Sequence, residues 1–442
     1  MLTNSISRRG MLKAAGITAA GTALPKWFLE ETLDAAEPFE PKSANDKPNV
    51  ALVGCGGRGR VDAKDAAKFG NIVAVCDVDD RHAEATARAD HPGAKPYHDF
   101  RKLMERDDID VIITATPDHW HTLVNLHAMH RGKDVYTEKP MTLTIDEGKR
   151  IVETVRKTGR VLQVGSQQRS DAKFRLACEL VRNGRVGKLE EVQVVIPAGH
   201  RGGPFPEEPI PQGFDWDFWQ GQAPAAPYCQ QRTHTTFRFW YDYSGGTMTD
   251  WGAHHNDIAR WAIGLDGPVE IDGKQLVEPI PGGYTAAPEY RVEYTYANGV
   301  KHVCLSTTGD QWTGGPAKEG PDVLHNGVTF KGTEGWIFVT RGKISASKPE
   351  LLNDPLPGNA TRLYVSNNHM GNFFDCVRSR KEPAASAEVG HRSVSVCHLG
   401  VLSMRLGRKL KWDPRKEKFV GDEEADKWLS REMRKPWSYD AV

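Results

Sequence analysis

Three glycines near the start of the chain, Gly54, Gly56 and Gly59, have the spacing Gly-x-Gly-x-x-Gly, which suits the binding of a pyrophosphate. The first glycine of such a loop allows a tight turn from strand to helix, the second lets the backbone approach the phosphates, and the third lets the helix pack on the strand. The phosphates then lie at the helix N-terminus, where free N–H groups and the helix dipole favour negative charge. With Gly57 and Arg58 inside the motif, this loop predicts a dinucleotide-binding turn.

A carboxylate follows the next apolar run at the distance that such a site requires. The run 71–76 has the composition of a β-strand and ends in Asp77, roughly 20 residues after the first glycine. A carboxylate there accepts a hydrogen bond from the ribose 2′-hydroxyl of NAD and repels the 2′-phosphate of NADP. The sequence therefore predicts NAD, with NADP as an alternative because Arg58 and Arg60 could pair with a phosphate. A helix N-cap at Asp77 or Asp79 is the structural alternative.

Helical and apolar segments alternate through the first part of the chain, which predicts an α/β domain with a doubly wound parallel sheet. The expected helices are 61–69, 80–89, 100–106 and 119–131, and the later strands are 110–115, 134–136 and 160–164. Ligands bind at the carboxyl ends of the strands in such sheets. The strand 110–115 is followed by four candidates for the nicotinamide side of the cleft: Thr116, Pro117, His119 and His121.

Two further motifs lie beyond that strand. The next strand ends in Thr-Glu-Lys-Pro (137–140), and a glycine-rich segment further on contains Asp-Trp-Gly-Ala-His (250–254). With these motifs and the dinucleotide loop, the chain resembles the glucose–fructose oxidoreductase/inositol dehydrogenase (Gfo/Idh/MocA) family over roughly 47–437. The motifs are specific for the family and weak for the substrate.

The resemblance implies roles for four residues. Glu138 and Lys139 would contact the cofactor, with Lys139 between the nicotinamide and the substrate and a peptide bond before the proline that is often cis. Lys139, Asp250 and His254 would form the catalytic set, because a histidine can take a hydroxyl proton and return it while an aspartate orients the histidine or stabilises its charged form. The structural alternatives are a Lys-Pro turn, an N-cap at Asp250 and a hydrogen-bonded buried imidazole at His254.

Beyond residue 168 the pattern changes from alternating helices and strands to strands joined by short turns. After a helix at 171–183, the expected strands are 188–196, 290–296, 300–307, 328–331 and 335–339. Apolar and polar residues alternate along several of them, which predicts a large, mainly antiparallel open sheet in an α+β domain. In the family such a sheet commonly builds the oligomer, so a homo-oligomer, a dimer or a tetramer, is expected.

The substrate side of the cleft is marked less clearly. The segment 204–243 is rich in aromatic and polar residues, which suit the apolar faces and hydroxyl edges of sugar rings; a well-packed long loop is the alternative. The candidate substrate contacts are Arg169, Trp240, His255 and His369. No metal site is expected, with a cluster of His254, His255 and Asp257 as the minor alternative.

Composition excludes several classes of function. The 58 basic and 58 acidic residues cancel, so no charge field indicates binding to nucleic acid or to an anionic membrane. The seven cysteines are scattered without a Cys-x-x-Cys motif and do not predict a disulfide framework.

The N-terminus indicates export. Arg8 and Arg9 precede a short apolar run of small residues at 14–24, which is typical of a twin-arginine signal and too short for a stable membrane anchor; a disordered basic tail is the alternative. A periplasmic or exported protein is therefore expected. The predicted organisation is a signal (1–36), a linker (37–46), an NAD-binding domain (47–168), a substrate and oligomerisation domain (169–411) and a surface tail (412–442).

Three functions are compatible with these features. The first is oxidation or reduction of a hydroxyl on a carbohydrate or polyol by hydride transfer, with NAD held tightly. The second uses the same groups to cleave a glycosidic bond through transient oxidation of the sugar and elimination. The third is a sugar-binding scaffold without activity, which the presence of Lys139, Asp250 and His254 together disfavours, because a binding protein needs no acid–base groups.

Overall fold

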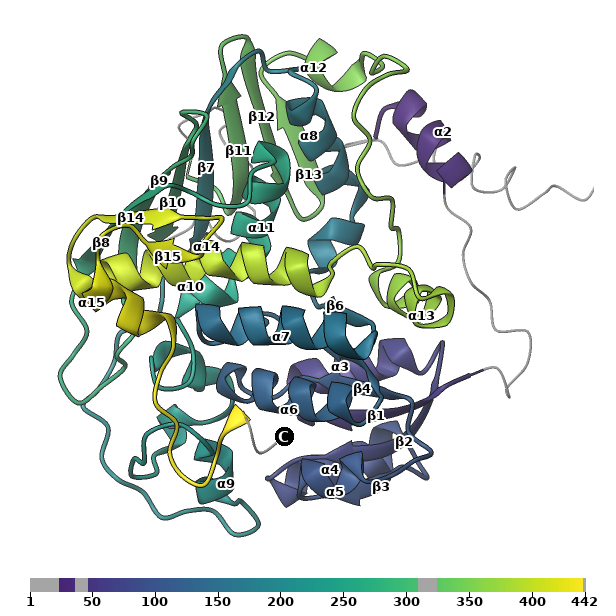
Figure 1. The fold of residues 1–442 in the computed structure, drawn as a ribbon, viewed down its shortest axis with the longest axis vertical. Helices are drawn as coiled ribbons and strands as arrows, with labels where there is room; N and C mark the ends of the chain where they lie inside the picture. Colours follow the sequence, from purple (N-terminus) through teal and green to yellow (C-terminus); the bar gives the residue numbers. More distant parts are fainter. Residues whose placement is uncertain (1–23, 36–46, 309–323, 440–442) are drawn as a thin grey trace, which may run out of the picture.

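A computed structural model of the chain describes residues 24–35, 47–308 and 324–439 (Figure 1). Its first sheet has six parallel strands in the order β3-β2-β1-β4-β5-β6. The strands are β1 (Asn49–Val53), β2 (Asn71–Cys76), β3 (Lys95–Tyr97), β4 (Val111–Thr114), β5 (Asp134–Thr137) and β6 (Leu162–Val164). The strand order reverses between β1 and β4, and in such sheets a ligand binds at this point, outside the carboxyl ends of the strands. The predicted doubly wound domain is confirmed.

Five helices connect these strands: α3 (Gly57–Ala66), α4 (Asp80–Ala85), α5 (Phe100–Met104), α6 (Asp118–His130) and α7 (Ile145–Thr158). Four of them were predicted and α7 was not; α3 and α4 differ from the predicted bounds by more than two residues. The helix α3 begins inside the glycine loop, with Gly56 as its N-cap, because the first turn is built from glycines that sequence patterns do not count as helix formers. The expected helix 80–89 is α4 followed by a π-helical turn, Thr86–Asp90.

The second sheet has nine strands in the order β13-β12-β11-β7-β10-β9-β8-β14-β15. Only β7 and β10 pair in parallel within it, so the predicted mainly antiparallel sheet is confirmed. Along β9 the residues Tyr290, Val292 and Tyr294 are buried and alternate with more exposed ones, as the period of two predicted. The strands are β7 (Leu189–Pro197), β8 (Glu270–Val277), β9 (Glu289–Thr295), β10 (Lys301–Thr307), β11 (Gly327–Gly332), β12 (Gly335–Thr340), β13 (Lys343–Ala346), β14 (Leu410–Asp413) and β15 (Lys418–Phe419).

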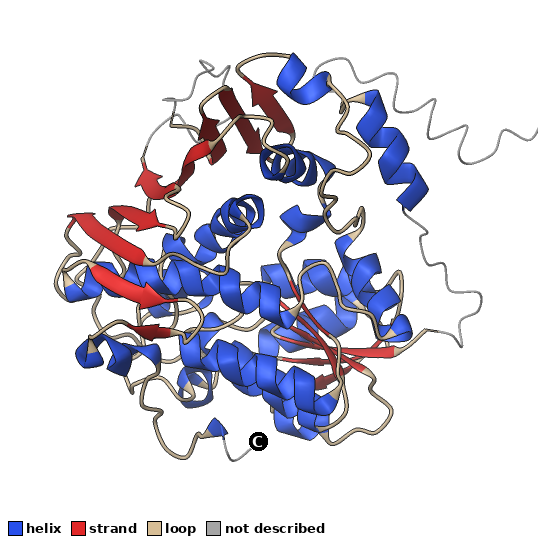
Figure 2. Cartoon of the chain, turned by 45° about the horizontal axis from the view of Figure 1, so that its top comes forward, coloured by secondary structure: helices blue, strands red, loops and turns tan. Residues whose placement is uncertain are grey.

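Three long helices lie on one face of this sheet, as Figures 1 and 2 show: α8 (Ala172–Arg182), α11 (Gly252–Ile263) and α14 (Ala387–Leu406). Shorter helices complete the domain: α9 (Trp216–Gln220), α10 (Thr247–Asp250), α12 (Glu350–Asn353) and α15 (Glu423–Asp426). The helix α13 (His369–Ser379) packs on the first domain, where Phe373 and Phe374 belong to the same apolar cluster as residues of β1. Of the helices in the described part of the chain, none combines the length and the apolar character needed to cross a membrane.

The residues just before the first domain form a helix, α2 (Lys26–Ala35), that packs on the second domain. Phe28 is fully buried, and the guanidinium of Arg175 on α8 lies 4.1 Å from its ring centroid. Thr32 is also buried and accepts a hydrogen bond from Arg175. This docked helix falls within 1–36, the segment expected to be a removable signal. The expected arginine pair at 8–9 and the linker 37–46 fall outside the described residues.

The end of the chain belongs to the fold instead of forming the expected surface tail. After β14 and β15 have extended the second sheet, the chain crosses back to the first domain and ends beside α6 (Figure 1). There the ring of Trp437 lies 4.8 Å from that of Trp120, and the Tyr439 hydroxyl donates a hydrogen bond to Glu147. The apolar residues scattered among the charges of this segment, Trp412 and Phe419 included, are buried and explain the difference.

Candidate functional site

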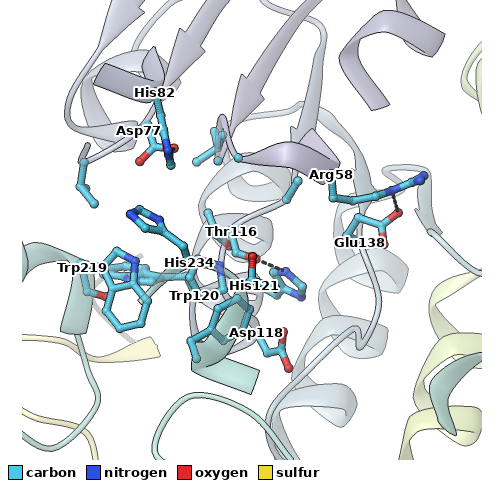
Figure 3. A pocket seen from close by; sticks show the side chains of 18 of the residues that line it. Arg58, Asp77, His82, Thr116, Asp118, Trp120, His121, Glu138, Trp219 and His234 are labelled. Carbon is cyan, nitrogen blue, oxygen red and sulfur yellow. Dashed lines mark hydrogen bonds and ion pairs between the residues drawn. The ribbon is translucent and has the colours of Figure 1, made fainter. Parts of the chain in front are cut away.

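A cavity of about 690 Å³ lies at the carboxyl ends of β1, β2, β4 and β5, between the first domain and the segment 198–250 of the second (Figure 3). This is the position that the reversal of strand order predicts. Eleven of the predicted site residues line it: Gly54, Gly56, Gly57, Arg58, Asp77, Thr116, Pro117, His121, Glu138, Lys139 and Asp250.

The glycine loop has the shape that a pyrophosphate requires. Gly54 has φ +95°, a conformation that favours glycine, and a Cβ on Gly59 would lie 1.9 Å from the Gly54 carbonyl oxygen. A Cβ on Gly56 or Gly57 would meet nothing within 4 Å, so this side of the loop is open to the cavity. No side chain caps α3 at Gly56, which leaves the first N–H groups of the helix to a bound anion. The loop therefore fits the phosphates of a dinucleotide.

Asp77 lies at the end of β2 and faces the same cavity. One carboxylate oxygen accepts a hydrogen bond from the backbone N–H of Cys55 (2.8 Å), and the other accepts one from that of Asp79 (2.9 Å). Each oxygen keeps a lone pair for a ribose hydroxyl. The N-cap alternative applies to Asp79, whose side chain accepts from the N–H of Arg81 at the start of α4, and not to Asp77.

Replacing Asp77 by alanine is expected to weaken NAD binding by about 10-fold, the effect of one lost hydrogen bond. The preference for NAD over NADP should also become smaller, because the charge that repels the 2′-phosphate is gone. Titration of both nucleotides into the cofactor-free protein measures the ratio of their dissociation constants. Asp65→Ala is the matched control, since Asp65 lies on α3 and pairs only with the exposed Lys68. An unchanged ratio in Asp77→Ala would contradict the assignment.

Lys139 and Asp250 join the two domains at the inner end of this cavity. The Lys139 ammonium lies 2.5 Å from Asp250 Oδ1 and 3.1 Å from its carbonyl oxygen, and Arg238 Nε lies 3.3 Å from the same Oδ1. Burial alone would raise the pKa of Asp250, yet the charges of Lys139 and Arg238 hold it below its usual value. Asp250 is therefore a carboxylate at neutral pH, and it fixes the position of the Lys139 ammonium.

His254 lies on α11 and is 5% exposed. It lines a second cavity of about 490 Å³ that shares Arg58, Glu138, Lys139 and Asp250 with the first. Within the described part of the chain, its buried Nδ1 has no hydrogen-bond partner. Burial, and after it the positive charge of Lys139, lowers the pKa of His254 well below 6.5, so the imidazole is neutral at neutral pH. The structure thus brings the three predicted catalytic residues to one place.

The structural alternatives for Asp250 and His254, an N-cap and a hydrogen-bonded core histidine, do not fit the contacts that these residues make. Asp250 is the last residue of α10 and caps no helix N-terminus, since Gly246 precedes α10 and Trp251 precedes α11. His254 is buried with an unpartnered nitrogen among the described residues, so it is not a satisfied core histidine. The Lys139–Pro140 peptide bond is cis, as the resemblance implied.

Hydrogen bonds hold the strand end that carries Lys139. Glu138 Oε1 lies 3.0 Å from Arg58 Nε and 2.8 Å from Gln167 Nε2. His121 Nδ1 bonds the Pro140 carbonyl (2.7 Å) and its Nε2 lies 2.9 Å from the Thr116 carbonyl (Figure 3). These contacts link the ends of β4 and β5 to the glycine loop, so Thr116 and His121, two of the residues predicted for the nicotinamide side, form one connected wall with Glu138.

Arg169 and His255, predicted to contact the substrate, line neither cavity. The Arg169 guanidinium is buried and makes two 2.7 Å hydrogen bonds to Asp257, with Trp261 against its other face. His255 is buried with Nε2 3.0 Å from Asn326. Both predictions are corrected, because the polar groups of these residues are turned toward partners inside the second domain.

Trp240, His369 and His119 also lie behind the cavity walls. Trp240 is buried and donates to the carbonyl of Gln231. His369 bonds Ser170 and the Val164 carbonyl, and burial lowers its pKa to about 4. His119, predicted beside the cofactor, is buried with Nε2 3.0 Å from the Trp219 carbonyl. The aromatic segment is thus largely a packed loop, although Phe218, Trp219, Phe237 and Phe239 line the first cavity.

The alternative metal cluster of His254, His255 and Asp257 is not assembled, because Asp257 bonds Arg169 and His255 faces Asn326. Among the residues that the structure describes, one group has ligand atoms close enough for a metal: Asp79, His82 and His234. Arg81 already binds both oxygens of Asp79.

Sequence reasoning missed many of the residues that line the two cavities, among them four polar side chains. His234 reaches from the second domain to His82, with ring centroids 4.7 Å apart, at the ribose end of the first cavity (Figure 3). Arg238 binds Asp250, and Gln168 and Arg341 line the second cavity. Only Gln168 carried a usable signal, since it follows β6 at the carboxyl edge of the sheet.

The parallel sheet, its glycine loop and the acid at the end of β2 define an NAD-binding Rossmann domain, here joined to an α+β domain that supplies Asp250 and His254. Two oxidoreductase-family models match the chain, one described as "NAD-binding Rossmann fold" over 48–166 and one as "C-terminal alpha/beta domain" over 201–439. The chain therefore belongs to the Gfo/Idh/MocA oxidoreductase family, as its motifs implied.

Similar proteins within the family carry different functional names, a dehydrogenase in one case and a glycosyl hydrolase in another. The scyllo-inositol 2-dehydrogenase (NAD(+)) of Bacillus subtilis is 26% identical over 345 residues, which are 75% of this chain and 87% of that protein. A glycosyl hydrolase family 109 protein of Saccharopolyspora erythraea is 33% identical over 208 residues, 42% of this chain and 45% of that protein, so the match spans less than half of that relative. The WlbA dehydrogenase of Bordetella pertussis, solved with NADH and UDP-GlcNAcA, has the same fold, with a TM-score of 0.62 and 19% identity over 83% of this chain and 99% of that one.

Proposed function

We propose that this protein is an NAD-dependent oxidoreductase that acts on a hydroxyl of a carbohydrate or polyol. The observation that carries the proposal is the meeting of Lys139, Asp250 and His254 where the two cavities join, directly beside the cofactor loop. The scyllo-inositol dehydrogenase of Bacillus subtilis, similar over most of its length, supports the substrate class. When bound, NAD supplies the acceptor for the hydride that leaves the carbon bearing the hydroxyl.

The side chains of the chain handle the proton of that hydroxyl. The Lys139 ammonium has three N–H donors, of which Asp250 takes two through its carboxylate and its carbonyl. The third donor is available to the substrate oxygen and orients it. The neutral His254 imidazole accepts the hydroxyl proton as the carbonyl forms, and returns it in the reverse reaction. Asp250 holds the Lys139 side chain in place throughout.

The walls of the first cavity support tight retention of the cofactor. The loop of the second domain that carries Phe214 and Asp215 is hydrogen-bonded to the residues after β2: the N–H of Asp80 donates to the Gly213 carbonyl, and the N–H of Asp215 donates to that of Val78. We therefore propose that NAD stays bound and is recycled between two substrates. An exported protein would need such retention, and the arginines at 8–9 support export; the open second sheet supports assembly into a homo-oligomer.

Two measurements on the purified full chain test the proposal. Mass spectrometry of the small molecules released by denaturation should find NAD or NADH in near-stoichiometric amount. Absorbance at about 340 nm, characteristic of reduced nicotinamide, should rise when a substrate sugar or polyol is added and fall when an oxidised acceptor follows. Protein that contains no nucleotide and binds none when it is added would overturn the proposal in favour of a scaffold.

A second candidate function is cleavage of a glycoside through transient oxidation of the sugar, with NAD regenerated in each cycle. The glycosyl hydrolase family 109 protein that matches 42% of the chain favours it. The same Lys139 and His254 would serve both reactions. Release of the chromophore from a nitrophenyl glycoside, without added oxidant and without net reduction of NAD, distinguishes this function from net oxidation.

The pH dependence of the reaction follows from the surroundings of His254. Only the neutral imidazole accepts a proton, and burial followed by the charges of Lys139 and Arg341 lowers its pKa well below 6.5. For this group, kcat/KM of oxidation should be flat above about pH 6.5 and fall only at lower pH. Replacing Arg341 by glutamine removes one positive charge near His254, which should raise the pKa of His254. The fall of kcat/KM at low pH should therefore begin at a higher pH. If kcat/KM of the wild-type protein fell with a midpoint above pH 6.5, this result would contradict the role of His254.

A further inference from the structure

Arg341 stands apart from the other charged residues of the second cavity. It lies in the turn between β12 and β13 and lines the cavity together with Lys139 and His254. Its guanidinium lies over the ring of Trp251, with Cζ 4.9 Å from the ring centroid. Within residues 24–35, 47–308 and 324–439, no carboxylate oxygen lies within 4 Å of this guanidinium. Stacking on the indole thus fixes a cation that has no ionic partner among the described residues.

The carboxylates of the same cavity are already bound. Glu138 accepts hydrogen bonds from Arg58 and Gln167, and Asp250 accepts them from Lys139 and Arg238. The third carboxylate, that of Asp171, caps α8.

Arg58 and Lys139, the other two cations of the cavity, each have a carboxylate within 3.0 Å. Burial and the charge of Arg58 lower the pKa of the Arg341 guanidinium, although the more distant carboxylates of the cavity act in the opposite direction. A guanidinium binds a carboxylate through two parallel hydrogen bonds, its strongest common pairing.

A second polar side chain of this cavity also has no partner. Gln168 is 3% exposed, and neither its amide oxygen nor its amide nitrogen forms a hydrogen bond within the described structure. A buried amide without partners destabilises the fold, so such a group points to a ligand. One hydroxyl group that donates and another that accepts would satisfy both atoms. Vicinal hydroxyls of a sugar ring have this property.

We infer that the second cavity binds a carbohydrate that carries a carboxylate, a sugar acid or its glycoside. Arg341 binds the carboxylate, Gln168 binds hydroxyls of the ring, and the reacting hydroxyl lies at Lys139 and His254. This inference rests on the proposed oxidation and deepens it by naming the substrate class. Arg341 thereby decides between acidic and neutral sugars, while Gln168 contributes equally to both.

Methyl glycosides that differ only at C6 test the inference, because their rings are locked in one form. The wild-type protein, assayed near pH 8 where His254 is neutral, should show a kcat/KM for methyl glucuronides and galacturonides roughly 10- to 100-fold higher than for the matching glucosides and galactosides, the range of a charge-assisted pair. Arg341→Gln should abolish this preference. Arg88→Gln is the control, since Arg88 is exposed, pairs with Glu84 and lies far from the cavity. Equal rates for acid and neutral sugars, or a preference that survives in Arg341→Gln, would overturn the inference.

Two further measurements separate this inference from the proposed function. Gln168→Met should lower kcat/KM for the acidic and neutral glycosides by the same factor and leave their ratio unchanged. Calorimetric titration of the NADH-loaded protein with the uronides measures binding without turnover. If no glycoside reduces bound NAD, the proposed oxidation fails, and uronide binding that Arg341→Gln weakens at least about 10-fold still supports the acidic class. Absence of uronide binding in wild type would refute it.

Discussion

Replacing Lys139 by methionine is expected to lower kcat of sugar oxidation by about 10²- to 10⁴-fold, the range typical for a positioned group in proton transfer. Methionine keeps most of the side-chain volume but donates no hydrogen bond, so the substrate oxygen loses the group that orients it. Arg238 still pairs with Asp250 in this variant, so the carboxylate is not left alone in the wall of the cavity. Steady-state kinetics gives the effect, and mass spectrometry of released NAD shows whether the cofactor is retained.

Two variants control this result. Lys149→Met removes a lysine of α7 that pairs with Asp146 and lies outside both cavities, and it should leave kcat unchanged. His254→Asn should reduce kcat by a similar factor as Lys139→Met. If the two groups act on the same proton, the double variant should be little slower than the slower single variant, because such effects are not additive. Turnover of Lys139→Met or His254→Asn close to wild type would refute the catalytic assignment.

Loss of α2 should be the largest effect on stability. Phe28 is fully buried, and replacing a buried phenylalanine by alanine costs about 3–5 kcal/mol of unfolding free energy. Phe28→Ala should therefore lower the midpoint of urea unfolding strongly, and a chain that begins at residue 37 should unfold at least as early. Lys26→Ala on the same helix is the control, since the Lys26 side chain is 89% exposed. Equal midpoints for Phe28→Ala and Lys26→Ala would contradict the packing of this helix.

The same helix places a limit on processing of the N-terminus. If a signal is removed during export, the mature chain should begin at or before Leu24, because α2 and the two residues ahead of it belong to the folded domain. N-terminal sequencing of the exported protein checks this. A mature protein that begins after Ala35 with undiminished stability would refute it.

The fold was predictable wherever one local pattern decided the structure. Continuous apolar runs gave β1, β2, β4, β5 and β6 but not the short strand β3, and alternation gave β9 to β12. The sequence could not show that α3 begins at Gly57, since glycines have low helix propensity and only the closed loop makes them helical. Phe28, Trp437 and Tyr439 pack against residues far away in the chain, so no local pattern reveals them.

The candidate site was predictable only where a motif fixes the geometry. The glycine loop, Asp77, Lys139, Asp250 and His254 belong to such motifs and line the cavities as expected. Arg169, His255 and His369 were misjudged because a sequence cannot show toward which neighbour a buried polar side chain turns. Arg341 was missed because it lies in an ordinary strand turn and reaches the cavity only through the arrangement of the second sheet.

Two segments, one on each side of the two domains in the sequence, each pack on the domain that is more distant along the chain. α2 lies ahead of the first domain in the sequence yet packs on the second, and Trp437 and Tyr439, which follow the last strand of the second domain, pack on α6 and α7 of the first. Trp437 packs against Trp120, which lines the first cavity, so during synthesis the NAD-binding domain lacks this support until residue 437 has been added. A product that terminates before residue 437 should therefore hold its nucleotide less tightly than the full chain.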